Sequence, residues 1–346
     1  MNLSKLLINW YSDNKRDLPW RNTTNPYFIW LSEIILQQTQ VAQGLPYYNA
    51  FTTNFPTVFD LAKAEEQEVL KLWQGLGYYS RARNLHASAK YIVEELNGEF
   101  PNTFDQIIKL KGVGDYTASA IASICFNEAT AVVDGNVYRA LSRIYGIDTP
   151  INTGKGFKQF KTLAQQLIDT KQPATFNQAV MEFGARLCKP KNPDCFSCPF
   201  NTKCVALQKN IISDLPVKLK NTKVTKKHFN FIVALSNDNK TVLEQRQGSG
   251  IWQNLYQFPL IETSKEASLS TIKNKIEALD FLKKKPFELT IYNEQPIIHK
   301  LSHQHLHTKF WILNLDETLP NGILTDKIQD YPVPILIGNF IEKFNF

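Results

Sequence analysis

The sequence predicts two domains, an all-α domain followed by a smaller α+β domain. From Leu3 to about Gln208, apolar residues recur at three- and four-residue spacing, as on one face of a helix. After a lysine-rich segment at 209–228 the pattern becomes extended, and runs typical of strands appear. A chain of 346 residues is long enough for about two domains, each with its own core.

Helical spacing is clearest in four segments of the first domain, which breaks rich in Gly, Pro and Asn separate. These segments are 26–39 (PYFIWLSEIILQQT), 81–96 (RARNLHASAKYIVEEL), 157–168 (FKQFKTLAQQLI) and 176–188 (FNQAVMEFGARLC). In the second domain the expected strands are 229–235 (FNFIVAL), 240–246 (KTVLEQR), 287–292 (FELTIY) and 307–313 (HTKFWIL). The expected helices there are 270–284 and 334–344. Helices followed by mixed elements are typical of an all-α domain joined to an α+β domain.

The charge balance is basic, with 39 Lys and Arg against 32 Asp and Glu and a net charge of +7. Such an excess suggests a polyanionic partner. No run of about 18 apolar residues occurs, so we expect no membrane span. The N-terminal segment MNLSKLLINWYSDNKRD is broken by polar residues too early for a secretory signal. We therefore expect a cytoplasmic protein.

Four of the five cysteines are clustered, with the spacing Cys-x6-Cys-x2-Cys-x5-Cys. In an intracellular chain such a cluster is more often a metal site than a set of disulfides. Four thiolates can hold zinc or a [4Fe–4S] cluster, and structural zinc usually takes two Cys-x2-Cys pairs. Because only one such pair occurs, the spacing favours iron–sulfur over zinc at Cys188, Cys195, Cys198 and Cys204. Cys125 is expected to be a buried apolar side chain.

The segment 110–120 (LKGVGDYTASA) places Gly112 and Gly114 between an apolar run and a run of small helix formers. A glycine pair of this kind can be a tight connection between helices. It can also direct successive backbone N–H groups at an anion.

Two carboxylates occur in contrasting surroundings. Glu33 lies in an apolar helical run, where burial should raise its pKa, although a solvated position or an arginine partner is the alternative. Asp134 ends the apolar run TAVVD and precedes Gly135, so it is expected as a helix N-cap that the helix terminus keeps ionised. One protonated and one anionic carboxyl can together cleave a glycosidic bond.

The glycine turn, the segment 131–141 (AVVDGNVYRAL) and the cysteine spacing occur in an order that resembles the endonuclease III superfamily of DNA glycosylases. The segments 18–41 (LPWRNTTNPYFIWLSEIILQQTQV), 72–86 (LWQGLGYYSRARNLH) and 132–143 resemble the adenine DNA glycosylase (MutY) family more specifically. The resemblance implies an all-α helix-hairpin-helix domain with an iron–sulfur loop. It also implies a [4Fe–4S] cofactor and double-stranded DNA as the partner.

The resemblance assigns roles to particular residues. It implies that Glu33 protonates adenine, that Asp134 stabilises the sugar cation, and that Asn136 supports the site. It implies an adenine pocket, into which the base is flipped, formed by Arg16, Trp20, Arg21, Leu36, Tyr116 and Gln178, for which core packing is the alternative. It also implies DNA contacts from Gln38, Thr39 and Tyr78, and a phosphate held by the backbone at Gly112 and Gly114.

Tyr116 occupies the position where bifunctional relatives place a lysine that forms a Schiff base. Because a tyrosine cannot form one, we expect a glycosylase without true lyase activity. Endonuclease III-type glycosylase/lyase activity on oxidised pyrimidines is the nearest alternative, and a non-catalytic lesion-binding protein is another.

The C-terminal segment 248–259 (GSGIWQNLYQFP) resembles the start of the Nudix-like domain of adenine DNA glycosylases, and the catalytic Nudix signature is missing. In that family the domain recognises 8-oxoguanine through a Phe-Ser-His loop, which corresponds here to Leu301, Ser302 and His303. Histidines at 299, 303, 305 and 307 are expected on strand faces, with a metal site as the alternative.

The expected organisation is a glycosylase domain over 1–208, with the hairpin at about 107–124 and the iron–sulfur loop at 188–204. A basic linker (209–228) and a Nudix-like 8-oxoguanine recognition domain (229–346) follow. The expected activity is removal of adenine mispaired with 8-oxoguanine or guanine during base excision repair. We expect a monomer that acts at the nucleoid.

Overall fold

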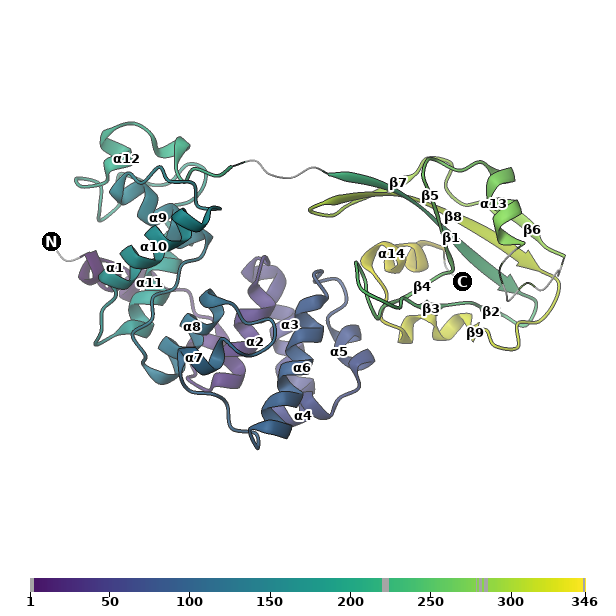
Figure 1. Ribbon diagram of the computed structural model, residues 1–346, viewed down its shortest axis with the longest axis horizontal. Helices are drawn as coiled ribbons and strands as arrows, with labels where there is room; N and C mark the ends of the chain where they lie inside the picture. The colour runs from purple at the N-terminus through teal and green to yellow at the C-terminus, as the bar shows by residue number, and fades with distance from the viewer. Residues whose placement is uncertain (1–2, 220–223, 278, 280–281, 283–285, 345) are drawn as a thin grey trace. The chain divides into compact units, whose positions relative to one another are not determined.

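The computed structural model describes residues 3–219, 224–277, 279, 282, 286–344 and 346 (Figure 1). By its internal contacts the chain divides into two compact units. The first unit comprises Met1–Lys63 and Asn84–Lys220, and the second comprises Ala64–Arg83 and Asn221–Phe346. The segment 64–83 therefore belongs with the C-terminal residues, although the chain returns to the first unit after it.

The first unit is helical, and its described residues contain no strand, which confirms the all-α prediction. Its elements are α1 (Leu3–Asn14), η1 (Pro19–Arg21), α2 (Pro26–Leu36), α3 (Val41–Asn54), α4 (Val58–Lys63), α7 (Phe104–Ile107), α8 (Asp115–Phe126), α9 (Gly135–Tyr145), α10 (Gly154–Leu167), α11 (Pro173–Arg186), α12 (Val205–Gln208) and η2 (Ile212–Asp214). The helix α6 (Ser80–Glu95) starts in the segment 64–83 and continues into this unit.

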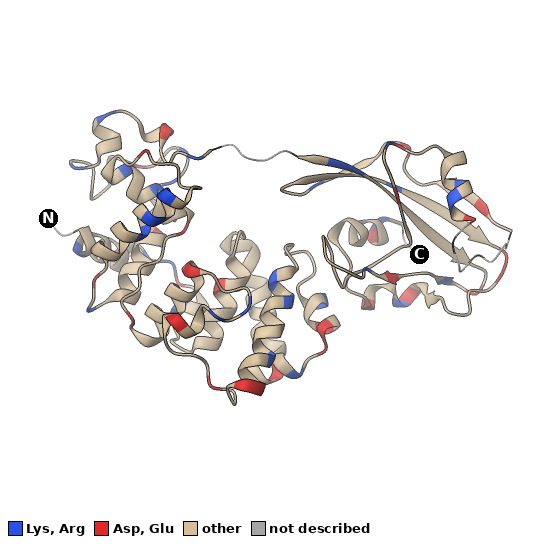
Figure 2. Ribbon diagram, in the orientation of Figure 1, with Lys and Arg blue, Asp and Glu red and all other residues tan. Residues whose placement is uncertain are grey.

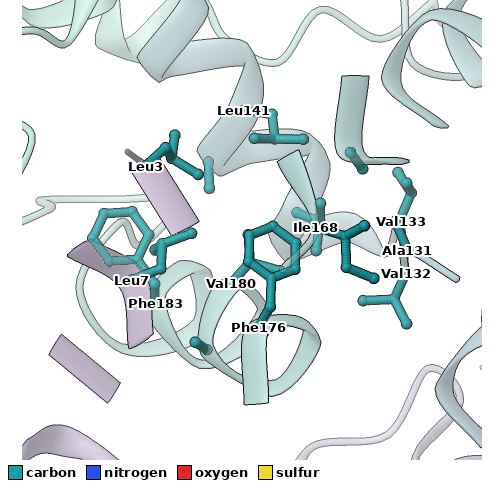
Figure 3. Close-up of a cluster of buried hydrophobic side chains, with 14 of the residues drawn as sticks. Leu3, Leu7, Ala131, Val132, Val133, Leu141, Ile168, Phe176, Val180 and Phe183 are labelled. Atoms are coloured by element: carbon teal, nitrogen blue, oxygen red, sulfur yellow. The ribbon is translucent and has the colours of Figure 1, made fainter. Parts of the chain in front are cut away.

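A buried apolar core joins α1, α9, α10 and α11 (Figure 3). Leu7 of α1 and Phe160 of α10 are fully buried in it, and Phe183 of α11 packs edge-to-face on Trp10 with ring centroids 5.5 Å apart. The apolar segment 131–133 enters the same core directly before α9 begins. Burial of this segment fixes the start of α9, and hence the position of the residue that caps it.

The glycine turn connects α7 to α8. Gly112 has φ +81°, and a Cβ atom there would approach Asn84 Cβ to 2.7 Å, so both the backbone angle and the space require glycine. Gly114 is the N-cap of α8 and makes no side-chain cap. The first N–H groups of α8 therefore have no capping side chain from Gly114.

The second unit contains a mixed sheet. The long strands β1 (Thr225–Ser236) and β8 (Gln304–Leu315) pair in parallel at its centre. The strand order is β5-β1-β8-β6, and β7 also pairs with β8. The flanking strands are β5 (Leu260–Thr263), β6 (Glu288–Ile291) and β7 (Ile297–Lys300). Two small two-stranded sheets pair β2 (Lys240–Thr241) with β9 (Ile323–Leu324) and β3 (Glu244–Gln245) with β4 (Tyr256–Gln257).

Both faces of the central sheet are covered, which explains the continuous apolar runs in β1 and β8. Ile232 and Trp311 pack with α13 (Leu269–Ile276) on one face. On the other face Phe231 stacks on Phe310, which in turn stacks on Phe340 of α14 (Ile335–Phe344) at 4.0 Å between centroids. The remaining helices are α5 (Glu66–Leu72) and η3 (Thr325–Asp330).

The structure confirms the α+β prediction and modifies several of its elements. The expected strand 240–246 is divided between β2 and β3, which pair with different partners. The expected helix 270–284 is formed as α13 up to Ile276, and part of the remainder lies outside the described residues. The strand β1 begins inside the segment 209–228 that was expected as a linker. Among the described helices, none has both the length and the apolar character that a bilayer-spanning helix needs.

Candidate functional site

Glu33 lies on α2. The N-cap of this helix is Asn25, whose side chain accepts a hydrogen bond from the Tyr27 backbone N–H, and Pro26 is its first residue. Burial raises the pKa of Glu33 to about 7, against a hydrogen bond with Tyr116 that lowers it. This is the direction expected from the apolar sequence around Glu33. Near neutral pH a substantial fraction of this carboxyl group therefore carries a proton.

Tyr116 lies in the first turn of α8, directly after the glycine turn. Its hydroxyl hydrogen-bonds with the Glu33 carboxyl and lies 3.2 Å from Met181 Sδ. Burial and the neighbouring carboxylates hold the pKa of Tyr116 well above its ordinary value, so the phenol stays protonated. The glycine turn thus places beside Glu33 a group that can donate a hydrogen bond to the carboxylate.

Asp134 caps α9 through one carboxylate oxygen and binds the Asn136 side chain with the other. Its Oδ1 accepts hydrogen bonds from the backbone N–H groups of Asn136 and Val137 at 2.9 and 2.8 Å, and its Oδ2 accepts one from Asn136 Nδ2 at 2.7 Å. Burial raises the pKa of Asp134, and these hydrogen bonds lower it. The effect expected from the helix N-terminus is therefore present, but burial outweighs it. Asp134 nevertheless accepts three hydrogen bonds that stabilise its ionised form.

The Asn136 side chain is in turn oriented by a hydrogen bond from Arg139. The Arg139 guanidinium donates to Asn136 Oδ1 at 2.8 Å, to the Gly184 carbonyl at 2.6 Å and to the Cys188 carbonyl at 2.7 Å. A Cβ atom at Gly184 would approach the Asn136 carbonyl oxygen to 2.6 Å, so glycine allows α11 to lie close to the start of α9. The first residue of the cysteine loop is thereby connected to the cap of α9 through one buried arginine. Arg139 was not among the residues predicted from the sequence.

Arg16 and Arg21 share one carboxylate, Glu182 of α11. Their guanidinium groups approach Glu182 Oε2 to 2.6 and 2.7 Å, and the Glu182 side chain is 1% exposed. Although burial alone would raise it, these hydrogen bonds lower the pKa of Glu182 to about 2. Glu182 was not among the residues predicted from the sequence, although it lies one helical turn after Gln178 and hence on the same face of α11.

A cavity of about 570 Å³ lies beside these arginines. Among the predicted pocket residues, Arg16, Arg21 and Gln178 line it, whereas Trp20, Leu36 and Tyr116 are not part of its described lining. Gln178 Oε1 accepts a hydrogen bond of 2.5 Å from Tyr11. Trp20 is buried and packs edge-to-face on Tyr48 at 5.1 Å. The structure therefore brings three of the predicted pocket residues to one cavity wall.

All four clustered cysteines line one further cavity, and their thiols are free of disulfides. Arg143 Nη1 lies 3.5 Å from Cys188 Sγ, and the Phe200 backbone N–H lies 3.4 Å from Cys198 Sγ. Convergent thiols with a cation and an N–H donor directed at sulfur fit an iron–sulfur cluster, because such donors stabilise thiolate ligands. Cys125 is partly buried away from this set, and burial raises its pKa to about 12.

The predicted DNA-contacting residues lie at turns, and all but the half-buried Thr39 are exposed. Gly112 and Gly114 are exposed before α8, and Lys161 Nζ holds the start of that helix through Asp115 Oδ1 at 2.6 Å. Gln38 is exposed with φ 56° just after α2, and Thr39 follows it. These residues belong to the first unit, whereas Tyr78 belongs to the second. Lys and Arg occur on helices and loops of both units (Figure 2).

The second unit has a cavity of about 490 Å³ that contains the three predicted 8-oxoguanine residues in its lining. Leu301, Ser302 and His303 share this lining with Tyr78 and Trp252. Ser302 Oγ lies 3.3 Å from His303 Nδ1, and both side chains are exposed. A planar group entering here would meet aromatic and apolar surface together with two hydrogen-bonding side chains.

Two families match this chain. Residues 31–166 match the HhH-GPD superfamily base excision DNA repair protein family, and residues 230–343 match the NUDIX domain family. The chain is also similar to the structure of a thermostable thymine-DNA glycosylase, with 28% identity and a TM-score of 0.56 over 60% of this chain and 95% of that one. A trapped endonuclease III–DNA covalent intermediate has the same fold, with 22% identity and a TM-score of 0.53 over 60% of this chain and 95% of that one. The protein is thus a helical base excision repair protein with a Nudix-like C-terminal domain.

Similar proteins of known function identify a more specific family within this class. An adenine DNA glycosylase of Buchnera aphidicola subsp. Schizaphis graminum (strain Sg) is 35% identical over 315 residues, which cover 90% of this chain and 87% of that protein. The Homo sapiens adenine DNA glycosylase is 47% identical over 212 residues, 59% of this chain and 39% of that protein. The chain belongs to the adenine DNA glycosylase family.

Proposed function

We propose that the protein is a monofunctional glycosylase that removes adenine mispaired with 8-oxoguanine or guanine in double-stranded DNA. The observation that carries this proposal is the contrast between its two carboxyl groups. Burial raises the pKa of both groups, that of Glu33 to about 7, but only Asp134 accepts three hydrogen bonds that favour its anion. A proton donor and a fixed anion are what cleavage of an N-glycosidic bond requires.

In this mechanism adenine is flipped out of the duplex into the site. The protonated carboxyl of Glu33 gives its proton to the base as the bond between the sugar and the base breaks, so adenine leaves as a neutral molecule. The anion of Asp134 stabilises the positive charge on the sugar, and Asn136 holds that anion in place. Water then adds to the sugar cation, the proton that this water loses restores the Glu33 carboxyl group, and an abasic site remains.

The groups near the glycine turn support a reaction without lyase chemistry. Tyr116 offers a phenol, which cannot form a Schiff base. The Lys161 amine lies nearby, but it donates to Asp115, Ser119 and the Ala131 carbonyl at 2.6 to 2.9 Å. An amine held by three acceptors, one of them a carboxylate, is a poor nucleophile.

The remaining predicted residues serve binding in this proposal. The backbone at Gly112 and Gly114 holds a phosphate, Gln38 and Tyr78 enter the base stack, and Ser302 with His303 contacts the base opposite adenine. An iron–sulfur cluster on the four cysteines would fix the shape of the loop that carries Lys189, Lys191 and Lys203, which could contact phosphates. The protein would act as a monomer.

The test is single-turnover cleavage of duplexes with adenine opposite 8-oxoguanine, guanine or thymine, read with and without alkali and with borohydride trapping. We expect strand breaks only after alkali, fastest opposite 8-oxoguanine, and no trapped complex. Asp134→Asn is the matched control for the negative charge, because asparagine carries no charge but also caps a helix well. Breaks without alkali together with trapping would indicate a glycosylase/lyase instead. Binding without cleavage of any adenine pair would indicate a lesion-binding protein.

A further inference from the structure

The segment 64–83 is bound to C-terminal residues through hydrogen bonds along its whole length. At its start, Glu66 Oε1 accepts a hydrogen bond of 2.5 Å from Asn254. In its middle, Lys71 donates to the Tyr331 carbonyl at 3.3 Å. At its end, Arg83 donates to the Gln253 carbonyl at 3.0 Å. The segment is therefore fastened at several points to the same part of the Nudix-like domain.

Two side chains fasten the loop 73–79 to a single residue, Val333. Gln74 Oε1 accepts a hydrogen bond of 3.2 Å from the Val333 N–H. The Tyr79 hydroxyl donates to the Val333 carbonyl at 3.3 Å and accepts from the Gly75 N–H at 3.3 Å. Tyr79 is 6% exposed, so its hydroxyl joins the loop backbone to the C-terminal domain away from bulk water.

The loop has an unusual backbone that needs such support. Gly75, Gly77 and Tyr78 all have positive φ, at 95°, 76° and 48°. For tyrosine this conformation is unfavourable and persists only where neighbouring contacts impose it. Arg81 supplies part of this support, because its guanidinium lies 5.7 Å from the Tyr78 ring centroid and donates to the Gly77 carbonyl at 3.2 Å.

The Tyr78 ring that this backbone presents is 49% exposed and lines the cavity that also contains Leu301, Ser302 and His303. We propose that the Nudix-like domain positions Tyr78 through the Tyr79–Val333 contact, so that the side chain entering the base stack and the residues contacting the opposite base move as one piece. Tyr79 is in this sense a positioning residue. The inference rests on the proposed function for the roles of Tyr78 and of Ser302 with His303.

Tyr79→Phe in the full-length protein tests the inference, because it removes one hydroxyl and keeps the buried ring. Tyr91→Phe is the matched control, since Tyr91 is exposed. Hydrogen exchange of the backbone at 75–79 should be about fivefold faster in Tyr79→Phe, the effect of losing one hydrogen bond, and unchanged in the control. Unchanged exchange in both variants would overturn the inference, whatever the enzyme does to DNA.

Two functional measurements extend the test. The preference for adenine opposite 8-oxoguanine over guanine should fall about fivefold in Tyr79→Phe. The fluorescence increase of 2-aminopurine placed beside the mispair, which reports unstacking, should fall with it. A fully retained preference and fluorescence signal would overturn the coupling between the two groups. A wild-type protein without adenine excision would instead contradict the proposed function, and the exchange result would still decide whether Tyr79 positions the loop.

Discussion

The candidate reaction site and the candidate recognition site are built in opposite ways. Glu33 and Asp134 are partly buried, and burial and neighbouring hydrogen-bond donors together set the pKa of each. Ser302 and His303 are exposed, and the contact between them is a weak one of 3.3 Å. Bond cleavage requires charges fixed before the substrate arrives, because reorganisation at the moment of reaction is costly. Recognition of a base requires exposed hydrogen-bonding groups whose water partners can be replaced by the base.

The largest expected effect is at the proton donor. Glu33→Gln should lower the single-turnover rate of adenine excision about 10²- to 10⁴-fold, because the amide cannot supply a proton. Binding of the uncleaved duplex, measured by fluorescence anisotropy, should stay within about twofold. If the variant retained more than about a tenth of the wild-type rate, Glu33 would not be the proton donor, and the contrast between the two sites would not hold.

A smaller effect is expected from the support behind Asp134. Arg139→Gln should lower the excision rate about 10- to 100-fold, because Asn136 loses the donor that orients it. Absorbance of the proposed iron–sulfur cluster, measured on the same sample, separates loss of the cluster from loss of orientation. If Arg139→Gln protein with its full cluster content excised adenine as fast as wild type, orientation of Asn136 by Arg139 would not be needed to support Asp134.

The pH dependence sharpens the account of Glu33. Its pKa is raised to about 7, and the proposed mechanism uses its protonated form, so the rate should fall about tenfold per pH unit above pH 7. The Tyr116 hydrogen bond lowers that pKa, so Tyr116→Phe should move the decline to higher pH. Tyr145→Phe, at an exposed position, should leave the profile unchanged. A shift to lower pH in Tyr116→Phe would contradict the assigned role of the hydroxyl.

The smallest effect is expected at the recognition site. Leu301→Phe should slow release of the 8-oxoguanine-containing product about fivefold, because an aromatic ring stacks on bases better than leucine does. Release of the guanine-containing product serves as the internal comparison. Equal release rates for Leu301→Phe and wild type would show that this side chain does not contact the stack.

Local features of both units were predictable from the sequence, because they depend on neighbouring residues. The helical period, the cap at Asn25 and the cap at Asp134 follow from side chains within a few positions. The Nudix-like strands β1 and β8 appear as apolar runs because both faces of the sheet are covered.

Features that depend on distant contacts were not predictable. Glu182 is an ordinary helical glutamate until Arg16 and Arg21, more than 160 positions earlier, fold against it. Burial of Asp134 likewise depends on the packing of other helices, so its raised pKa could not be inferred from its capping position. The attachment of Lys71 to the Tyr331 carbonyl spans 260 positions and leaves no local pattern.

The discontinuous second unit limits how this protein can recombine. A chain ending near residue 208 would still carry Glu66, Lys71, Gln74 and Tyr79, but without the C-terminal groups that they bind. A C-terminal domain acquired from a relative would need residues that accept the same segment. A C-terminal domain exchanged together with its own version of residues 64–83 would keep these hydrogen bonds.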